Sequence, residues 1–429
     1  MKKKILSLLV VLCLVMSSVT AMSMAADSQT TAYKTAMSKT ESYMIKKLSN
    51  PGYNDEWYVI GLARGSAAVS DAAYQTYYKN LEKAVKNSKG ILDKKKYTEY
   101  SRVILALTAI EKDPSNVGGY NLLEKLADFE NVRWQGINGS IWALIALDSG
   151  MYEIPTVKDV KVQTTRDLLI KDILDQEIDG GGFSLDGKIA DSDITGMAIQ
   201  ALAGYVNRSD VKAAVDRALN ALSDMQKADG GFASFGTKNA ESNCQVIVAL
   251  TALGIDPAKD TRFIRNDKSV LDALMTYYVE DGGFRHVNKS TGGYQPVVNS
   301  MATEQGFYAL VAYDRFLNGK SSLYDMTDGK TISKPGKSTI TSLKSTKTKT
   351  LTVKWKKISS AKGYQVRYAQ NSKFTGSKSL TVSKSTLQKT VKSLQKGKTY
   401  YVKVRAYKTD VKGGKIYGSY STAKKVKVK

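Results

Sequence analysis

The sequence carries the same short turn three times, about fifty residues apart. The turn reads Asp-Gly-Gly-Phe, with one extra Gly in the first copy, at residues 179–183, 229–232 and 281–284. Glycines after Asp supply the positive-φ positions that a tight turn between helices needs, and the Phe is expected to pack back onto the turn. A turn repeated at a fixed period predicts a repeat architecture.

Helical patterns surround these turns. Before the second copy, apolar residues recur at helical spacing between Asp210 and Gln226. A short apolar helix is expected after each turn, at residues 199–202, 247–250 and 307–310. Looser versions of this helix occur earlier in the chain, at residues 104–107, 141–144 and 60–63. Six helix pairs favour a closed (α/α)6 toroid over residues 27–326. An open solenoid is the alternative, although it usually has a tighter period and polar caps. A closed ring has a central funnel, which is a natural small-molecule pocket.

The turn motif extends upstream to a glutamine. The segment Gln226-x-x-Asp229-Gly-Gly-Phe232 resembles the QW-type repeat of the prenyltransferase and squalene–hopene cyclase superfamily; Gln176 begins a second copy, and Tyr278 replaces the Gln in the third. Residues 97–109, 134–148 and 240–255 are similar to bacterial exported proteins with this toroid, and so to the barrel of intrinsic factor and transcobalamin. The resemblance implies a toroid over residues 33–326 and a corrinoid as the best single ligand. One such fold serves zinc enzymes, cyclases and non-catalytic carriers.

The enzymes of this superfamily have catalytic motifs that can be compared with this sequence. Zinc prenyltransferases use an Asp-x-Cys pair and a distant His, whereas Ser242 stands two positions before Cys244 and His286 is the only histidine. We therefore expect no metal site and no cofactor. Class II terpene cyclases protonate an alkene with an Asp-x-Asp-Asp-Thr motif, and Asp191-Ser-Asp193-Ile-Thr195 keeps two of its acids and the Thr. Asp193 is the general acid under this alternative.

A further enzymatic alternative is a carbohydrate-active (α/α)6 enzyme. Such enzymes set paired carboxylates across a cleft, and Glu99, Asp193 and Glu241 are the candidates in this chain. The sequence gives no separation between them.

Polar and aromatic residues near the starts of the short apolar helices are the candidate ligand-binding residues. The polar ones can equally be helix caps, because acids satisfy free amides and meet the positive end of the helix dipole. Each aromatic residue alone also fits core packing. The complete set, for a binding protein that holds an amphipathic small molecule, is Trp57, Glu99, Tyr100, Trp134, Gln135, Asp193, Glu241 and Glu304.

The pattern changes to a period of two after residue 326. Apolar residues alternate with polar ones in several segments, which predicts an immunoglobulin-like sandwich over residues 338–429, after a linker at 327–337. Trp355, the Ala361–Tyr364 segment and the Leu394–Tyr400 pair resemble a fibronectin type III domain, in which Leu394 and Tyr400 match the tyrosine corner.

Almost all of the positive charge lies in this last segment. The whole chain carries a net charge of +24, and Lys334–Lys429 contains 26 Lys and Arg but only one acid, Asp410. Such a segment concentrates anionic polymers. We expect cell-wall or surface polyanions as partners, and no specific nucleic acid.

The N-terminus has the pattern of an export signal. Lys2–Lys4 precede an apolar run at residues 5–16 and small-residue cleavage options near Ala26, which predicts a signal peptide at 1–26. An uncleaved anchor is the alternative. No stretch has the 18 apolar residues of a membrane span. We therefore expect a secreted protein that associates with the cell surface.

Overall fold

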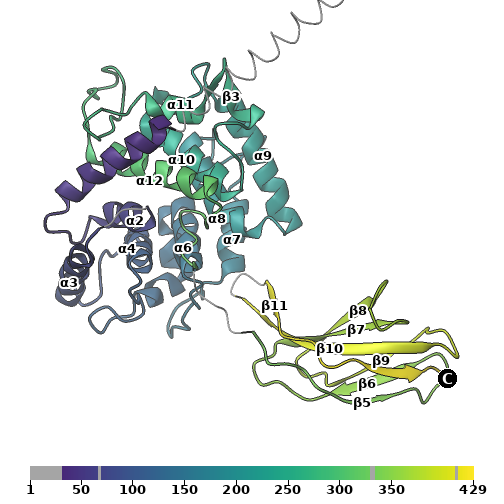
Figure 1. The fold of residues 1–429 in the computed structure, drawn as a ribbon. Helices are drawn as coiled ribbons and strands as arrows, with labels where there is room; N and C mark the ends of the chain where they lie inside the picture. Colours follow the sequence, from purple (N-terminus) through teal and green to yellow (C-terminus); the bar gives the residue numbers. More distant parts are fainter. Residues whose placement is uncertain (1–30, 66–68, 329–333, 411–413) are drawn as a thin grey trace, which may run out of the picture. The chain divides into compact units, whose positions relative to one another are not determined.

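The structure, a computed structural model, describes residues 31–65, 69–328, 334–410 and 414–429. The predicted signal peptide lies outside these residues. The chain divides into two compact units, Met1–Asp328 and Gly329–Lys429, which are described separately below (Figure 1). None of the helices within the described ranges has the length and apolar character that a membrane crossing requires.

The first unit is helical, and two classes of helix alternate along it. One class packs against its own members: α2 (Glu56–Arg64), α4 (Thr98–Ala109), α6 (Ile137–Ser149), α8 (Ser192–Leu202), α10 (Ala240–Ala252) and α12 (Ser300–Leu317). The other class begins with residues 31–47, which precede α2. Its remaining members lie between consecutive helices of the first class: α3 (Asp71–Asn87), α5 (Phe129–Val132), α7 (Arg166–Leu174), α9 (Ser209–Met225) and α11 (Val270–Met275). Short 3-10 helices and hairpins complete the connections: η1 (Leu122–Ala127), η2 (Arg133–Gln135), η3 (Ala203–Tyr205), η4 (Thr261–Phe263), β1 (Ala233–Ser234) with β2 (Thr237–Lys238), and β3 (Ile264–Arg265) with β4 (Lys268–Ser269).

The sequences of the two classes explain their places. Helix α9 is amphipathic, as the spacing of its apolar residues predicts, and only one side of it is buried. Helix α10 is buried on all sides from Ala240 to Thr251, because most of its residues are small or apolar and its larger polar side chains bond within the unit. The α10-type helices are therefore interior, and the α9-type helices cover them.

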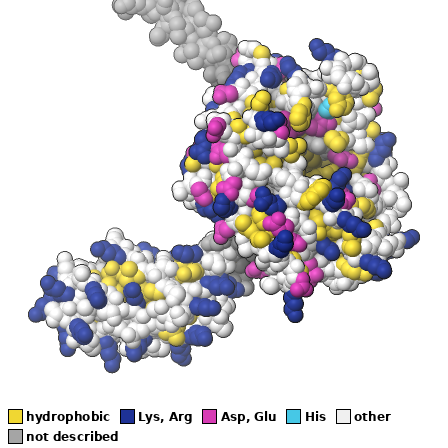
Figure 2. All heavy atoms as spheres, turned by 180° about the vertical axis from the view of Figure 1, so that it is seen from behind, with side chains coloured by type: hydrophobic (Ala, Val, Ile, Leu, Met, Phe, Trp, Pro, Cys, Tyr) yellow, Lys and Arg dark blue, Asp and Glu magenta, His cyan; other side chains and the backbone are white. Residues whose placement is uncertain are grey.

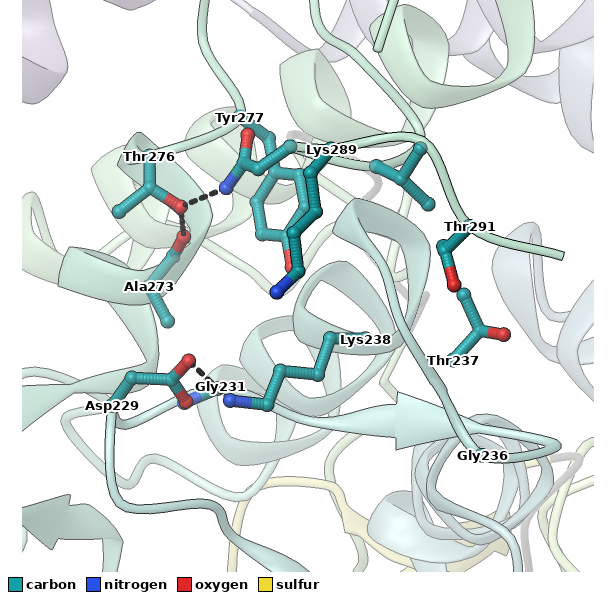
Figure 3. A pocket seen from close by; sticks show the side chains of 12 residues that line it. Asp229, Gly231, Gly236, Thr237, Lys238, Ala273, Thr276, Tyr277, Lys289 and Thr291 are labelled. Atoms are coloured by element: carbon teal, nitrogen blue, oxygen red, sulfur yellow. Dashed lines mark hydrogen bonds and ion pairs between the residues drawn. The ribbon is translucent and has the colours of Figure 1, made fainter. Parts of the chain in front are cut away.

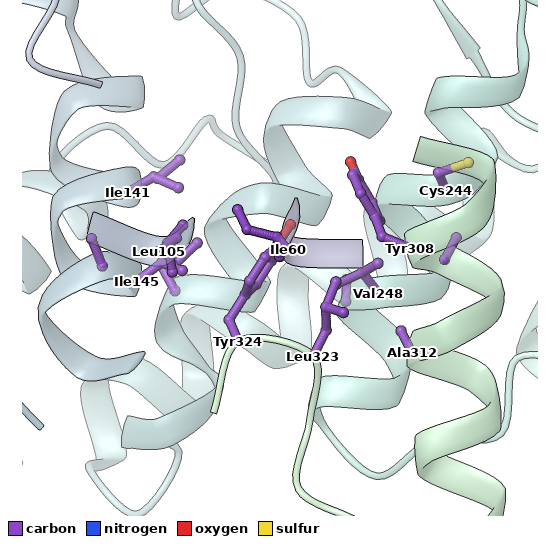
Figure 4. Close-up of a cluster of buried hydrophobic side chains, with 14 of the residues drawn as sticks. Ile60, Leu105, Ile141, Ile145, Cys244, Val248, Tyr308, Ala312, Leu323 and Tyr324 are labelled. Carbon is purple, nitrogen blue, oxygen red and sulfur yellow. The ribbon is translucent and has the colours of Figure 1, made fainter. Parts of the chain in front are cut away.

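The interior helices contact one another in a closed circuit. Helix α2 packs on α4, α4 on α6, α6 on α8, α8 on α10, α10 on α12, and α12 returns to α2. The side chains at the centre form a continuous apolar cluster that includes Ile60, Leu105, Ile141, Val248 and Tyr308 (Figure 4).

The chain after α12 crosses the C-terminal ends of the interior helices. Leu323 and Tyr324 from this segment reach into the apolar cluster (Figure 4). The backbone N–H of Met326 donates to the carbonyl of Ser149, at the end of α6, at 2.9 Å. Arg64, at the end of α2, donates through Nε to the carbonyl of Leu323 at 2.9 Å. This segment therefore closes one end of the centre of the helical unit.

The repeated turns have the backbone that the sequence predicts. Gly181, Gly230 and Gly282 have φ values of 101°, 81° and 109°. The three Phe side chains of the turns are fully buried, and each Phe N–H donates to a polar side chain of the following interior helix: Thr195, Asn243 and Thr303. The three turns therefore share one set of contacts.

The second unit is a sandwich of two antiparallel sheets (Figure 1). One sheet has the order β5 (Ile340–Lys344), β6 (Leu351–Trp355), β9 (Gln388–Val391). The other has the order β11 (Lys415–Tyr417), β10 (Thr399–Thr409), β7 (Gly363–Ala369), β8 (Lys378–Ser383), and β12 (Lys424–Lys427) also pairs with β10.

The core of the sandwich confirms the alternation seen in the sequence. Val353, Val366, Val402 and Val404 are fully buried between the sheets. The Tyr400 hydroxyl accepts a hydrogen bond from the backbone N–H of Gln395 at 3.2 Å, which is the contact of a tyrosine corner.

Candidate functional site

A cavity of about 220 Å³ lies at the N-terminal half of the interior helices. Every one of the six interior helices contributes at least one side chain to its wall: Trp57, Thr98, Glu99, Arg102, Asn138, Trp142, Met197, Gln245, Gln305 and Tyr308. We call it the central cavity. Figure 2 shows acidic side chains and apolar side chains beside the hollowed part of this unit.

One cation, Arg102, dominates the electrostatics of the central cavity. Its Nη2 lies 2.6 Å from Oε2 of Glu99, and its Nε lies 2.9 Å from Oε2 of Glu56. The Glu56 side chain is completely buried, and burial raises its pKa although Arg102 and the N–H of Asn54 oppose the shift. Glu99 also accepts a hydrogen bond from the Tyr53 hydroxyl at 2.9 Å. The charge of Arg102 is therefore shared between two carboxylates.

Neutral groups form the rest of the wall. Trp57 and Trp142 meet edge to face with ring centroids 5.2 Å apart. The amide Nε2 of Gln245 donates to the Tyr308 hydroxyl at 2.7 Å and to Oε1 of Gln305 at 2.9 Å. Aromatic faces next to amide and hydroxyl groups suit a ligand with both apolar and hydrogen-bonding parts.

Only Trp57 and Glu99, of the eight candidate residues from the sequence, line the central cavity. Tyr100 is 1% exposed, and its hydroxyl donates to the carbonyl of Asp93 at 2.9 Å, so its role is in the core. Trp134 is 59% exposed, with the Lys95 ammonium 5.1 Å above its ring. Gln135 lies in η2, where its Oε1 accepts from the N–H of Thr98 at 3.1 Å.

The capping interpretation needs a correction at Asp193. The residue that caps α8 is Asp191, whose side chain accepts from the N–H groups of Asp193 and Ile194. Asp193 lies in the first turn, and burial raises its pKa to about 6, with bonds from Ser242 and Ser192 opposing the shift. Its carboxyl is not part of the wall of the central cavity.

Two further acids lie on α10 and α12. Glu241 is 6% exposed, and its Oε2 lies 2.8 Å from Nδ1 of His286. Glu304 lies near the start of α12, as the sequence predicts, but beyond its first turn, because the helix begins at Ser300 and is capped by Asn299. Burial and the nearby Asp55 raise the pKa of Glu304 to about 7.

Cys244 is fully buried, and burial raises the pKa of its thiol well above the ordinary value. Within the described ranges, no group of three His, Cys, Asp or Glu side chains is placed to hold a metal ion.

The sequence did not single out most of the residues that line the central cavity. Arg102, Trp142 and Gln245 each follow, by four residues, a polar side chain at or near the start of an interior helix. Residues four apart share a helix face. This spacing is the signal that could have identified them.

A second pocket, of about 440 Å³, lies beside the turn at 229–232. Asp229, Lys238, Tyr277 and Lys289 contribute to its wall (Figure 3). It shares no lining residue with the central cavity. We call it the turn pocket.

The outer face of the five-stranded sheet in the second unit carries cations stacked on tyrosines. The Arg405 guanidinium lies 3.7 Å from the ring centroid of Tyr417, and the Lys403 ammonium lies 4.4 Å from that of Tyr420. Arg367 on β7 lies directly opposite Lys403 on β10 in the register of the two strands. Burial and the nearby Arg367 and Arg405 lower the pKa of Lys403. Positive charge is therefore concentrated on this face.

Comparison with known proteins identifies the family of the second unit. Residues 333–417 match the family described as the fibronectin type III domain. The chain is similar to the crystal structure of the chicken CNTN1 FN1–FN3 domains, with 24% identity, a TM-score of 0.19, and coverage of 22% of this chain and 30% of that one. It is also similar to the FN5 domain of Drosophila Lar, with 23% identity, a TM-score of 0.19, and coverage of 22% and 96%. No curated protein matches the chain. The C-terminal unit is a fibronectin type III domain, as the sequence predicts.

Proposed function

We propose that the helical unit is an (α/α)6 toroid and that it binds a small amphipathic molecule in the central cavity. The observation that carries this proposal is the wall of the cavity, to which all six interior helices contribute. The closed circuit of helix contacts supports a ring, because an open solenoid has no contact between its first and last interior helices, such as that between α2 and α12. The turn at Gly282, whose Cβ would lie 2.5 Å from the carbonyl of Lys39, supports closure in the outer layer as well.

The volume and lining of the cavity constrain the ligand. About 220 Å³ is below the roughly 300–1,000 Å³ that encloses most drug-sized ligands. A corrinoid, the ligand favoured by the resemblance, would place only one of its peripheral groups in the cavity, with the macrocycle outside. Arg102 is already paired with two carboxylates, so the amides and the two Trp rings provide most of the recognition.

The alternative is an enzyme, and one observation favours it. A carboxyl with a pKa of about 6, as at Asp193, holds a proton in mildly acidic solution and can act as a general acid. Against this, Asp193 does not contribute to the wall of the central cavity. In a terpene-cyclase-like or carbohydrate-active enzyme, Asp193→Asn abolishes turnover; in a binding protein, it leaves ligand affinity within about tenfold.

We propose further that the protein is exported and that its fibronectin type III domain attaches it to anionic polymers of the cell wall or surface. The charge of residues 334–429 and the cation-bearing sheet face support this. Binding of the full chain to purified cell walls is expected to weaken steeply between about 50 and 500 mM salt. Arg405→Gln is expected to bind less tightly than Lys83→Gln, which removes an exposed charge from α3 instead. Salt-insensitive binding would contradict attachment by charge.

Ligand retention tests the cavity. Native mass spectrometry of the protein purified from its own source is expected to show a bound small molecule. Met197 lines the cavity, so Met197→Trp fills it and is expected to abolish retention, whereas Trp134→Ala, at an exposed Trp outside the cavity, is expected to keep it. A ligand retained equally by both variants is bound elsewhere, and this result would refute the proposal.

A further inference from the structure

The turn pocket is formed by two parts of the chain. The turn at 229–232 and the β1–β2 hairpin form one side, and residues 287–291 with Tyr277 form the other (Figure 3). Its volume of about 440 Å³ is twice that of the central cavity and falls within the range of small-molecule sites.

Tyr277 brings a hydroxyl to the pocket that has no hydrogen-bond partner among the described residues. The residue as a whole is 6% exposed, and its hydroxyl is not among the fully enclosed polar atoms that lack a partner, so it is open to the pocket. Figure 3 shows that hydroxyl directed into the pocket, beside the ammonium of Lys289. Burial and the nearby Asp229 raise the pKa of Tyr277 to about 12, so the hydroxyl stays protonated at neutral pH and can donate. A donor that opens into the pocket can bond to a ligand oxygen.

The charges in the pocket do not balance. The Lys238 ammonium is paired with Oδ2 of Asp229 at 2.6 Å. Lys289 is exposed, and it has no ion pair among the described residues. One positive charge is therefore left to attract an anionic group.

Neutral hydrogen-bonding groups surround this charge. The hydroxyls of Thr237 and Thr291 lie on the side opposite Thr276 (Figure 3). Asn288 donates through Nδ2 to the Thr276 hydroxyl at 2.7 Å, which holds the amide in place. Ala273, Val287 and part of the Tyr277 ring add apolar wall. Apolar wall, several hydroxyls and one cation match the C–H groups, the hydroxyls and the carboxylate of an acidic sugar.

We propose that the turn pocket binds a uronic acid, either as a free sugar or as a residue of an acidic polysaccharide. The sugar carboxylate pairs with Lys289 and accepts from the Tyr277 hydroxyl, the sugar C–H groups lie against the apolar wall, and the sugar hydroxyls bond to Thr237 and Thr291. This proposal does not depend on the ligand of the central cavity.

Calorimetric titration of the full chain with D-glucuronate, D-glucose and inorganic phosphate tests the proposal, and a uronate oligosaccharide separates the two sources. We expect glucuronate to bind at least about fivefold more tightly than glucose or phosphate, because a charge-assisted bond and the sugar contacts act together. A larger affinity for the oligosaccharide than for glucuronate would identify the polymer as the source.

Two variants locate the binding. Lys289→Ala is expected to weaken glucuronate binding about tenfold, and Tyr277→Phe, which removes only the hydroxyl, about threefold. Lys83→Ala on α3 is the matched control and is expected to bind as the original chain does. Glucuronate affinity that is unchanged in both pocket variants, or equal affinities for glucuronate and phosphate, would overturn the proposal.

Discussion

The ion pair between Arg102 and Glu56 provides a test of how the interior of the helical unit is held together. Glu56 has a fully buried side chain, which also accepts from the Asn54 N–H at 3.1 Å and from the Tyr77 hydroxyl at 3.2 Å. Replacing Arg102 with Gln removes the only cation that pairs with this carboxylate among the described residues. Breaking a buried ion pair on one side costs about 3–5 kcal/mol, since the remaining charge is uncompensated. We expect Arg102→Gln to lower the free energy of unfolding by about 3 kcal/mol at pH 7, because the two hydrogen bonds to Glu56 remain.

The pH dependence distinguishes this cause from lost packing. Burial raises the pKa of Glu56 in the folded state, so the folded state binds more protons than the unfolded state above pH 4.5, and stability falls as pH rises through the folded pKa. Removing Arg102 raises that pKa further, so the variant is expected to regain stability between pH 8 and pH 5. Urea unfolding followed by helical circular dichroism measures this, and Glu56→Gln combined with Arg102→Gln is the control. A deficit that is independent of pH, or one that the double variant does not reduce, would refute the reasoning.

Three further outcomes are expected from the structure. Asp193→Asn should raise the free energy of unfolding by about 1–2 kcal/mol at pH 7.5 and change it little at pH 4, as measured by urea unfolding at the two pH values. The reason is that the Asp193 carboxyl has a folded pKa of about 6, so its ionisation destabilises the original protein as pH rises through that value. Gly282→Ala should lower the melting temperature more than Gly236→Ala: both have positive φ, but only the Cβ at Gly282 would meet a backbone oxygen, that of Lys39, so equal effects would contradict the packing of this turn. Tyr400→Phe should destabilise the fibronectin type III domain by about 1–2 kcal/mol in thermal unfolding, because its hydroxyl bonds are lost, and an unchanged transition would show that they contribute nothing.

The sequence predicts local structure well where one interaction dominates. The alternation around Val353 and Val402 has one solution, because a shift by one residue would expose every apolar side chain of the strand. The glycines of the repeated turns are equally restrictive, since few residues other than glycine adopt a φ of 109° as at Gly282. The sequence signals the start of α12 only weakly, because the cap at Asn299 follows a long connection without helical periodicity.

The site could be predicted only in part, because its residues come from six separate helices. Composition at a helix start identifies Trp57 and Glu99, but it also selects Trp134, which is exposed, and Tyr100, which is in the core. The difference depends on how each helix is rotated about its axis, and this rotation is set by contacts with neighbours far away in the sequence. The pairing of Arg102 with Glu56, 46 residues earlier in the chain, has the same origin.

The two ends of the interior helices differ in a way that bears on how a ligand reaches the central cavity. At the C-terminal ends, Leu323 and Tyr324 fill the centre, and Arg64 holds this segment through four hydrogen bonds besides its pair with Asp328. The connections that lead into the interior helices, together with the first turn of α12, carry eight of the eleven large apolar side chains that are exposed in the described part of the chain: Ile91, Trp134, Leu185, Ile189, Phe235, Tyr294, Val297 and Met301. Under the proposed function, the ligand therefore enters from the N-terminal ends of the interior helices, where the Leu323–Tyr324 segment does not close the centre.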